Sequence, residues 1–126
     1  MVVLFTTGLA WWLLDAGSSP ARFYLMAAHG LAAMAFLVAF GAIFALHVRE
    51  GWRRRLNRAS GALVLTVTGL LIPSALGLYY IGSDALRGLT SDLHIATGLV
   101  LPFLLAAHVV LGRRARLHSK DPRNGS

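Results

Sequence analysis

Four apolar stretches alternate with short polar segments along the chain. The apolar stretches cover residues 2–14, 23–48, 59–81 and 93–111. A helix that spans a bilayer needs about 20 consecutive apolar residues, and the last three stretches meet that length. The first stretch is short, so a signal peptide is its alternative interpretation, but no basic residue precedes Val2. The pattern therefore predicts an all-α fold, an integral membrane four-helix bundle with a short first helix.

Four polar segments separate or follow these helices. We expect a turn at residues 15–20, a charged loop at residues 49–58 and a polar loop at residues 82–91, with at most one helical turn at residues 84–86. A basic segment follows Gly112, and its end, residues 121–126, is expected to be disordered. The chain thus divides into a transmembrane domain of residues 1–112 and a basic tail of residues 113–126.

Composition and charge support insertion into a membrane. Hydrophobic residues make up 56% of the chain and charged residues 13%, about half the charge of a typical soluble domain. The chain has no cysteine, which excludes disulfides, iron–sulfur clusters and covalently attached haem.

The basic residues indicate an orientation in the bilayer. The net charge is +7, and ten of the twelve Lys and Arg residues lie in residues 49–58 or after Gly112. Clusters at the ends of apolar stretches are typical of membrane orientation and argue against nucleic-acid binding. The asymmetry predicts that both termini are cytoplasmic and that the chain is a multi-pass protein in lipid.

Four of the five histidines lie inside the apolar stretches: His29 and His47 in the second, His94 and His108 in the fourth. Titratable side chains are costly in a membrane and usually functional there. At about 100° per residue, separations of 18 and 14 residues place each pair on one face of its helix. The second and fourth helices run in the same direction, so His29 lies level with His94 near the outer surface, and His47 lies level with His108 near the inner surface. Two imidazoles at one level can ligate a haem iron from both sides, which predicts two haems b.

The two histidine separations, 18 and 14 residues, are unequal, so the two pairs do not match in height without some adjustment. Eighteen residues rise roughly 27 Å along a helix and fourteen roughly 21 Å. Tilt, a helix irregularity or unequal haem inclination must absorb the difference, and Pro102 is expected to kink its helix. His47 is the ligand most sensitive to this difference.

Residues on the same faces are candidates for haem contact. Small residues would let a flat macrocycle approach the backbone, and larger ones would fill the space between two haems, although ordinary helix packing also explains them. The candidates are Gly30, Ala33, Phe36, Phe40, Gly98, Leu101 and Leu105. Arg22, Arg49 and Arg113 lie near the two levels and are candidates to pair with haem propionates; solvated orienting charge is their alternative role.

Other roles for the histidines remain open at this point. They could be hydrogen-bonded structural groups, although four in this pattern would be unusual. A proton relay would need intramembrane carboxylates, and the apolar stretches hold none. A metal transporter would need Cys, Met or carboxylate ligands, and only Met26 and Met34 flank His29. Tyr79 and Tyr80 are expected to be interfacial anchors, with the border of a quinone pocket as a second role.

The run from His94 to Gly112, with the pattern HxxTGxxLPxxLxxHVxxG, resembles membrane diheme cytochromes b. The fourteen-residue separation of His94 and His108 is similar to that in the cytochrome b of quinol–cytochrome c reductases, whereas that of His29 and His47 is four residues wider. In size the chain looks more like small bacterial four-helix cytochrome b subunits of the hydrogenase, formate dehydrogenase and cytochrome b561-like groups, in several of which the ligands lie on other helices. The resemblance covers about residues 23–112.

The resemblance implies electron transfer across the bacterial inner membrane, between a quinone pool and a redox partner subunit such as a multihaem cytochrome. The chain would then be a diheme subunit of an oxidoreductase complex. A self-contained quinone-linked reductase or oxidase, of the superoxide or ferric type, is one alternative. A structural or metal-transporting membrane subunit with no redox role is another.

Overall fold

The computed structural model describes residues 1–14, 20–53 and 57–118, and all of its regular elements are helices. They divide into two compact units, Met1–Arg49 and Glu50–Ser126, which we describe separately. The predicted all-α fold is confirmed. The predicted turn at residues 15–20, except Pro20, and the predicted disorder of residues 121–126 lie outside the described residues.

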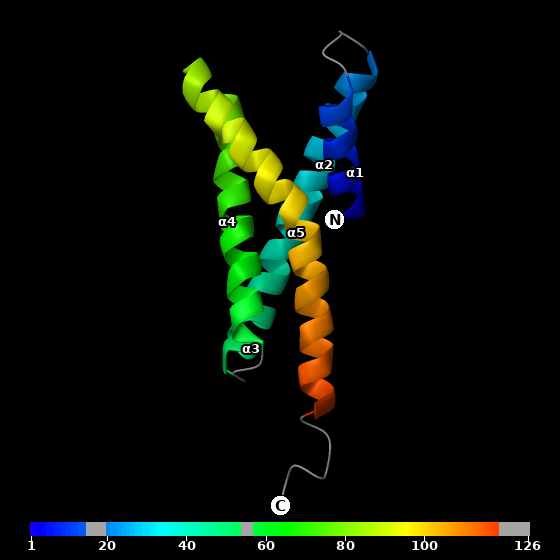
Figure 1. Ribbon diagram of the computed structural model, residues 1–126, viewed down its shortest axis with the longest axis vertical. Helices are drawn as coiled ribbons and strands as arrows, with labels where there is room; N and C mark the ends of the chain where they lie inside the picture. Colours follow the sequence, from blue (N-terminus) through cyan, green and yellow to red (C-terminus); the bar gives the residue numbers. More distant parts are fainter. Residues whose placement is uncertain (15–19, 54–56, 119–126) are drawn as a thin grey trace, which may run out of the picture. The chain divides into compact units, whose positions relative to one another are not determined.

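The first unit is a helical hairpin. Helix α1 covers Val2–Leu13 and packs against α2, Pro20–Ile43, which returns in the opposite direction (Figure 1). Proline suits the first turn of a helix because its missing N–H would have no intrahelical partner there. At 12 residues, α1 is shorter than a hydrocarbon core requires, as expected from the sequence.

Helix α2 does not end where the apolar stretch does. It passes directly into a π-helical turn, η1 (Phe44–Val48), and then into α3 (Arg49–Arg53). Glu50 and Arg53 form an exposed ion pair at 3.0 Å on α3. The expectation that a loop begins at Arg49 is therefore wrong, because these residues continue the helix for one more turn.

The second unit is also a hairpin, formed by α4 (Arg58–Tyr80) and α5 (Asp84–His118), which pack side by side. Within the predicted loop over residues 82–91, the helical turn at residues 84–86 is confirmed, and the loop from Arg87 onward is wrong. Its leucines at 86, 89 and 93 recur at helical spacing, and Asp84 lies in the first turn, where a negative charge favours a helix. The backbone N–H of Arg87 closes that turn on the Ser83 carbonyl at 2.9 Å.

Helix α5 also continues past Gly112 to His118, so the predicted tail begins as helix. Arginine is a good helix former, and cations at a helix C-terminus interact favourably with its dipole. Figure 1 shows that α5 changes direction near the middle of its length. Pro102 lies inside this helix, in agreement with the expected kink.

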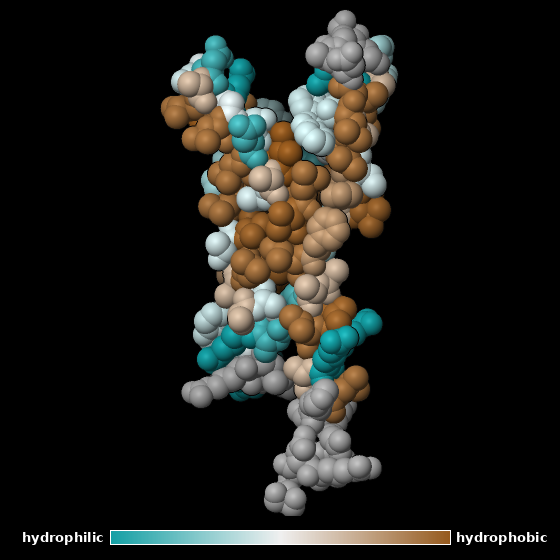
Figure 2. Space-filling model, in the orientation of Figure 1, coloured by the Kyte–Doolittle hydropathy of each residue, from teal (hydrophilic) through white to brown (hydrophobic). Residues whose placement is uncertain are grey.

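Three helices are long and apolar enough to cross a membrane: Pro20–Arg53, Arg58–Tyr80 and Asp84–Leu117. Most of their large apolar side chains are exposed, and Val64 and Leu101 are the buried apolar side chains among the described residues. On the face drawn in Figure 2, hydrophobic residues cover the middle of the helices and hydrophilic residues gather toward their ends. An exposed apolar surface of this extent is typical of a surface that contacts lipid or other protein.

Candidate functional site: hydroxyl-supported histidines

His29 lies on α2 and faces α1 within the first unit. The imidazole Nδ1 of His29 is 3.1 Å from the Thr7 hydroxyl oxygen. A Cβ atom built on the neighbouring Gly8 would come within 3.1 Å of the His29 Cε1 atom. The glycine therefore leaves the room that the ring occupies, and the threonine provides its polar partner.

His94 lies on α5 and faces α4 in the same manner. Its Nδ1 is 3.1 Å from the hydroxyl oxygen of Ser74, which is one of the two buried polar residues among those described. The Ser74 hydroxyl donates to the Leu71 carbonyl at 2.8 Å. A hydroxyl that donates to a carbonyl one turn earlier in its own helix keeps lone pairs with which it can accept.

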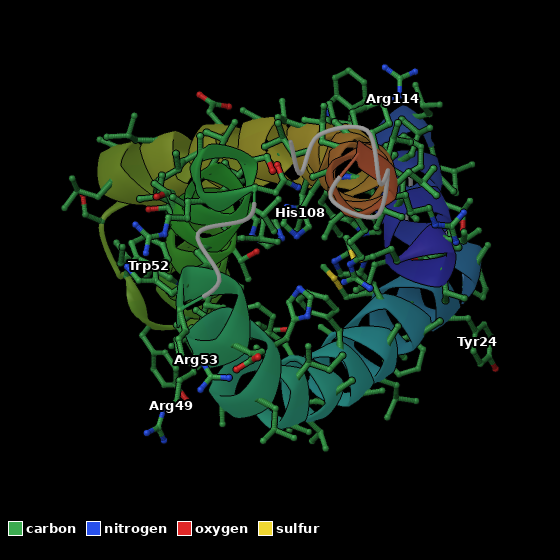
Figure 3. The ribbon with its side chains drawn as sticks, turned by 90° about the horizontal axis from the view of Figure 1, so that it is seen from below. Tyr24, Arg49, Trp52, Arg53, His108 and Arg114 are labelled. Atoms are coloured by element: carbon green, nitrogen blue, oxygen red, sulfur yellow. The ribbon has the colours of Figure 1, made fainter. Side chains whose placement is uncertain are left out.

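His108 lies ten residues before the end of α5 at His118 (118 − 108 = 10) and contacts the start of α4 (Figure 3). Its Nδ1 is 2.9 Å from the Ser60 hydroxyl oxygen and 3.3 Å from Asn57 Nδ2. The Asn57 Nδ2 amide donates to the His108 backbone carbonyl at 2.9 Å. A Cβ atom on Gly61 would come within 3.4 Å of the His108 Cε1 atom.

These contacts are compatible with one tautomer for all three histidines. Each hydroxyl lies within hydrogen-bond distance of an oxygen that can only accept: Val3 O for Thr7 at 2.6 Å, Leu71 O for Ser74 and Asn57 Oδ1 for Ser60. A hydroxyl that gives its one proton to such an oxygen accepts from Nδ1–H. In that tautomer the neutral ring carries the lone pair on Nε2, the form of imidazole that binds a metal ion.

The sequence analysis identified the histidines but missed their hydroxyl partners. A signal for two of them is present: Ser60 and Ser74 are 14 residues apart, as are His94 and His108 (74 − 60 = 14; 108 − 94 = 14). In an antiparallel hairpin, equal spacings bring both pairs into register at once. A second signal is the glycine that follows Thr7 and Ser60 directly.

His47 lies within the π-helical turn η1 and is exposed. The shared face of His29 and His47 was derived for an uninterrupted α-helix, and that assumption is wrong at Phe44–Val48. A π turn contains an extra residue, which rotates later side chains by up to roughly 100° relative to a regular helix. A π turn is also one of the helix irregularities that could absorb the difference between the two histidine spacings. Such turns occur frequently at functional sites.

The other candidate residues take up varied positions. Phe36 and Phe40 stack with ring centroids 5.8 Å apart, and Phe40 lies 5.8 Å from Phe44. Leu101 is fully buried, so the shared face of His94, Leu101 and His108 is the inner face of α5. Gly98 lies near the Leu71 side chain. Gly30, Ala33 and Leu105 are half-buried, and contact of any of these residues with haem stays a prediction.

The candidate arginines have partners or are exposed. The Arg22 guanidinium lies 4.6 Å from the centroid of the Trp11 ring, a cation–π contact within the first unit. Arg49 and Arg113 are exposed. Their pairing with haem propionates also stays a prediction.

Each unit holds two of the four histidines, so each predicted pair joins the two units. Both pairings stay predictions. Within the described ranges, no group of three or more His, Asp or Glu side chains is arranged to hold a metal ion; a haem iron takes two axial ligands from the protein.

Comparison of the chain with models of protein families, with curated proteins and with solved structures finds no match. The resemblance to diheme cytochromes b therefore depends on the residues of this chain alone.

Proposed function

We propose that the chain is a membrane-embedded electron-transfer subunit that holds two haems b. His29 and His94 would be the axial ligands of one haem, and His47 and His108 those of the other. Electrons would pass across a bacterial inner membrane between a quinone and a redox partner subunit. Both termini would lie on the cytoplasmic side, where the arginine clusters gather.

The observation that carries the proposal is a hydroxyl oxygen within 3.1 Å of the Nδ1 atom in each of His29, His94 and His108. Histidines that ligate a metal almost always donate their other ring N–H to a nearby acceptor, which fixes the tautomer and the ring orientation. Here the acceptors are Thr7, Ser74 and Ser60. A donor set of neutral imidazoles without cysteine fits the two axial positions of haem b.

The setting of these histidines gives further support. They lie on helices that are long and apolar enough to span a bilayer, where a polar ring is retained for a function more often than for packing. Haem b, when bound, supplies a one-electron couple of the iron. The chain's own hydroxyl groups would orient the imidazoles and hold a proton at Nδ1.

Paired substitutions test the ligand assignment. The protein expressed with haem available should show a b-type α-band after reduction with dithionite. His29→Leu with His94→Leu should remove one haem and leave one, because both ligands of a single site are lost. His29→Leu with His108→Leu should remove both haems, and His118→Leu, outside the apolar stretches, should remove neither.

Two results would refute the proposal. A colourless wild-type protein would exclude haem binding altogether. Two retained haems in any of the four single variants at His29, His47, His94 and His108 would exclude that histidine as a ligand.

A further inference from the structure

The start of α4 carries a polar arrangement that neither of the other hydroxyl–histidine pairs has. Asn57, the residue before α4, adopts a left-handed backbone conformation with φ 53°, and it is the one such non-glycine residue described. This conformation is uncommon outside glycine and asparagine. Strained positions of this kind persist where the surrounding structure holds them, and they cluster at functional sites.

The Asn57 side chain does not cap its own helix. Asparagine is favoured at the N-cap because its side-chain oxygen accepts a backbone N–H of the first turn. In this protein the N-cap position makes no such side-chain bond. The amide reaches instead to α5, where its Nδ2 donates to the His108 carbonyl at 2.9 Å.

The result is a closed ring of hydrogen bonds between α4 and α5. His108 Nδ1 lies 2.9 Å from the Ser60 hydroxyl, which donates to Asn57 Oδ1, while Asn57 Nδ2 lies 3.3 Å from Nδ1 and donates to the His108 backbone carbonyl. Gly112 lies beside the amide, since a Cβ atom there would be 3.5 Å from Asn57 Nδ2, in ordinary van der Waals contact. We name Asn57 and Ser60 together the asparagine bracket.

The three hydrogen-bond chains end on different acceptors. Those from His29 and His94 end on the carbonyls of Val3 and Leu71, which belong to helix backbones. The chain from His108 ends on a side-chain amide oxygen that does not serve a helix ladder. An acceptor that is not shared with a helix N–H is free to polarise the hydroxyl and, through it, an imidazole N–H. Such polarisation raises the basicity of the ring as a ligand.

We propose that the asparagine bracket holds His108 as an axial ligand and lowers the reduction potential of the haem that His108 binds. The proposal rests on the proposed function. A more basic axial ligand stabilises the ferric state relative to the ferrous state, since second-shell hydrogen bonds are among the groups that set haem potentials. Asn57 and Ser60 are positioning residues, because they act through His108.

A redox titration of the purified holoprotein, followed at the α-band, tests the proposal. Asn57→Gly keeps the left-handed backbone at no steric cost and removes the amide. Asn57→Gly and Ser60→Ala should each shift one of the two potentials upward, and it should be the same one. Ser60→Thr, which keeps the hydroxyl, should keep the wild-type value.

Matched controls separate tuning from loss of structure. Thr68→Val removes a buried hydroxyl from α4 that bonds to its own helix at Val64 and should leave both potentials unchanged. The shifted potential should be the one that disappears in His108→Leu. Unchanged potentials in Asn57→Gly, or an equal shift in Thr68→Val, would overturn the proposal while leaving the haem sites intact.

Failure of the proposed function gives a different result. If the wild-type protein binds no haem, the asparagine bracket has no role in setting a haem potential. ¹⁵N NMR of the histidine-labelled protein would then report the tautomers directly. A change from Nδ1–H to Nε2–H at His108 in Ser60→Ala would still support the bracket as the device that positions His108, and an unchanged tautomer would overturn that as well.

Discussion

Single hydroxyl groups decide how the candidate ligands are presented. An imidazole N–H buried without an acceptor costs about 1–3 kcal/mol, and Thr7, Ser74 and Ser60 each place a hydroxyl oxygen from the neighbouring helix within 3.1 Å of an Nδ1 atom. The histidines could be predicted from sequence because a titratable ring in an apolar stretch is conspicuous. Their partners could not, because serine and threonine are ordinary residues in membrane helices and become informative only when the register of the hairpin is known.

Removing the Thr7 hydroxyl should disturb His29 and little else. In Thr7→Val the His29 ring loses its hydroxyl partner, so we expect a loss of about 1 kcal/mol in the free energy of unfolding and an upward shift of one haem potential. Thr6→Val is the matched control, because the Thr6 hydroxyl bonds to Val2 and Val3 in its own helix. Equal effects of the two substitutions in thermal unfolding and redox titration would contradict the role of Thr7.

The glycine beside the ring should be equally specific. A Cβ atom at Gly8 would lie 3.1 Å from His29 Cε1, whereas one at Gly41 would meet nothing within 4 Å. Gly8→Ala should therefore push the ring aside, at about 1–3 kcal/mol of overpacking, and should lower the occupancy of one haem. Gly41→Ala should not. Full haem content in Gly8→Ala, measured as pyridine haemochrome, would show that the ring tolerates the displacement.

At the scale of helices, the apolar pattern predicted where each spanning segment lies but not where its helix ends. Both ends of α5 are polar, and so is α3, yet these residues are helical. Charged side chains near helix termini and leucines at helical spacing favour a helix even where the hydropathy of the sequence falls. The π turn at Phe44–Val48 left no recognisable mark in the sequence. The backbone hydrogen bonds of a π turn join residues five apart instead of four. A run of apolar residues is compatible with either hydrogen-bond pattern.

The π turn offers a test of its own. Deleting Ala45 removes the extra residue and should convert Phe44–Val48 into regular α-helix, which would rotate His47 away from its present direction. We expect loss of the haem that His47 and His108 bind and retention of the other, read from haem content and the reduced spectrum. A variant with both haems and unchanged potentials would show that the direction of His47 is unimportant.

At the scale of the whole molecule, the chain consists of two helical hairpins, and each carries two of the four histidines. The hairpins themselves follow from short connections between apolar stretches, so they could be predicted. The pairing of His29 with His94 and of His47 with His108 depends on helices from different hairpins. This pairing was derived from helical periodicity and from the asymmetry of the basic residues. These two features predict the direction of each helix in the membrane, but they carry no information on which helix faces contact one another.

The orientation in the membrane can be tested with topology reporters. Because the basic clusters favour the cytoplasmic side, a green fluorescent protein fused after Ser126 should fluoresce. Alkaline phosphatase is active outside the cytoplasm. Inserted at Gly82 it should be active, since Gly82 connects the end of α4 to the start of α5 and these ends lie away from the basic clusters. The reverse pattern would place the termini outside and overturn the assignment of the inner and outer histidine levels.

The haem-to-protein ratio of the purified wild-type protein tests the central claim most directly. The account predicts two haems b per chain, both low-spin and both lost when His29, His47, His94 and His108 are replaced together. A protein that is folded, embedded in membranes and supplied with haem, yet contains none, would contradict it.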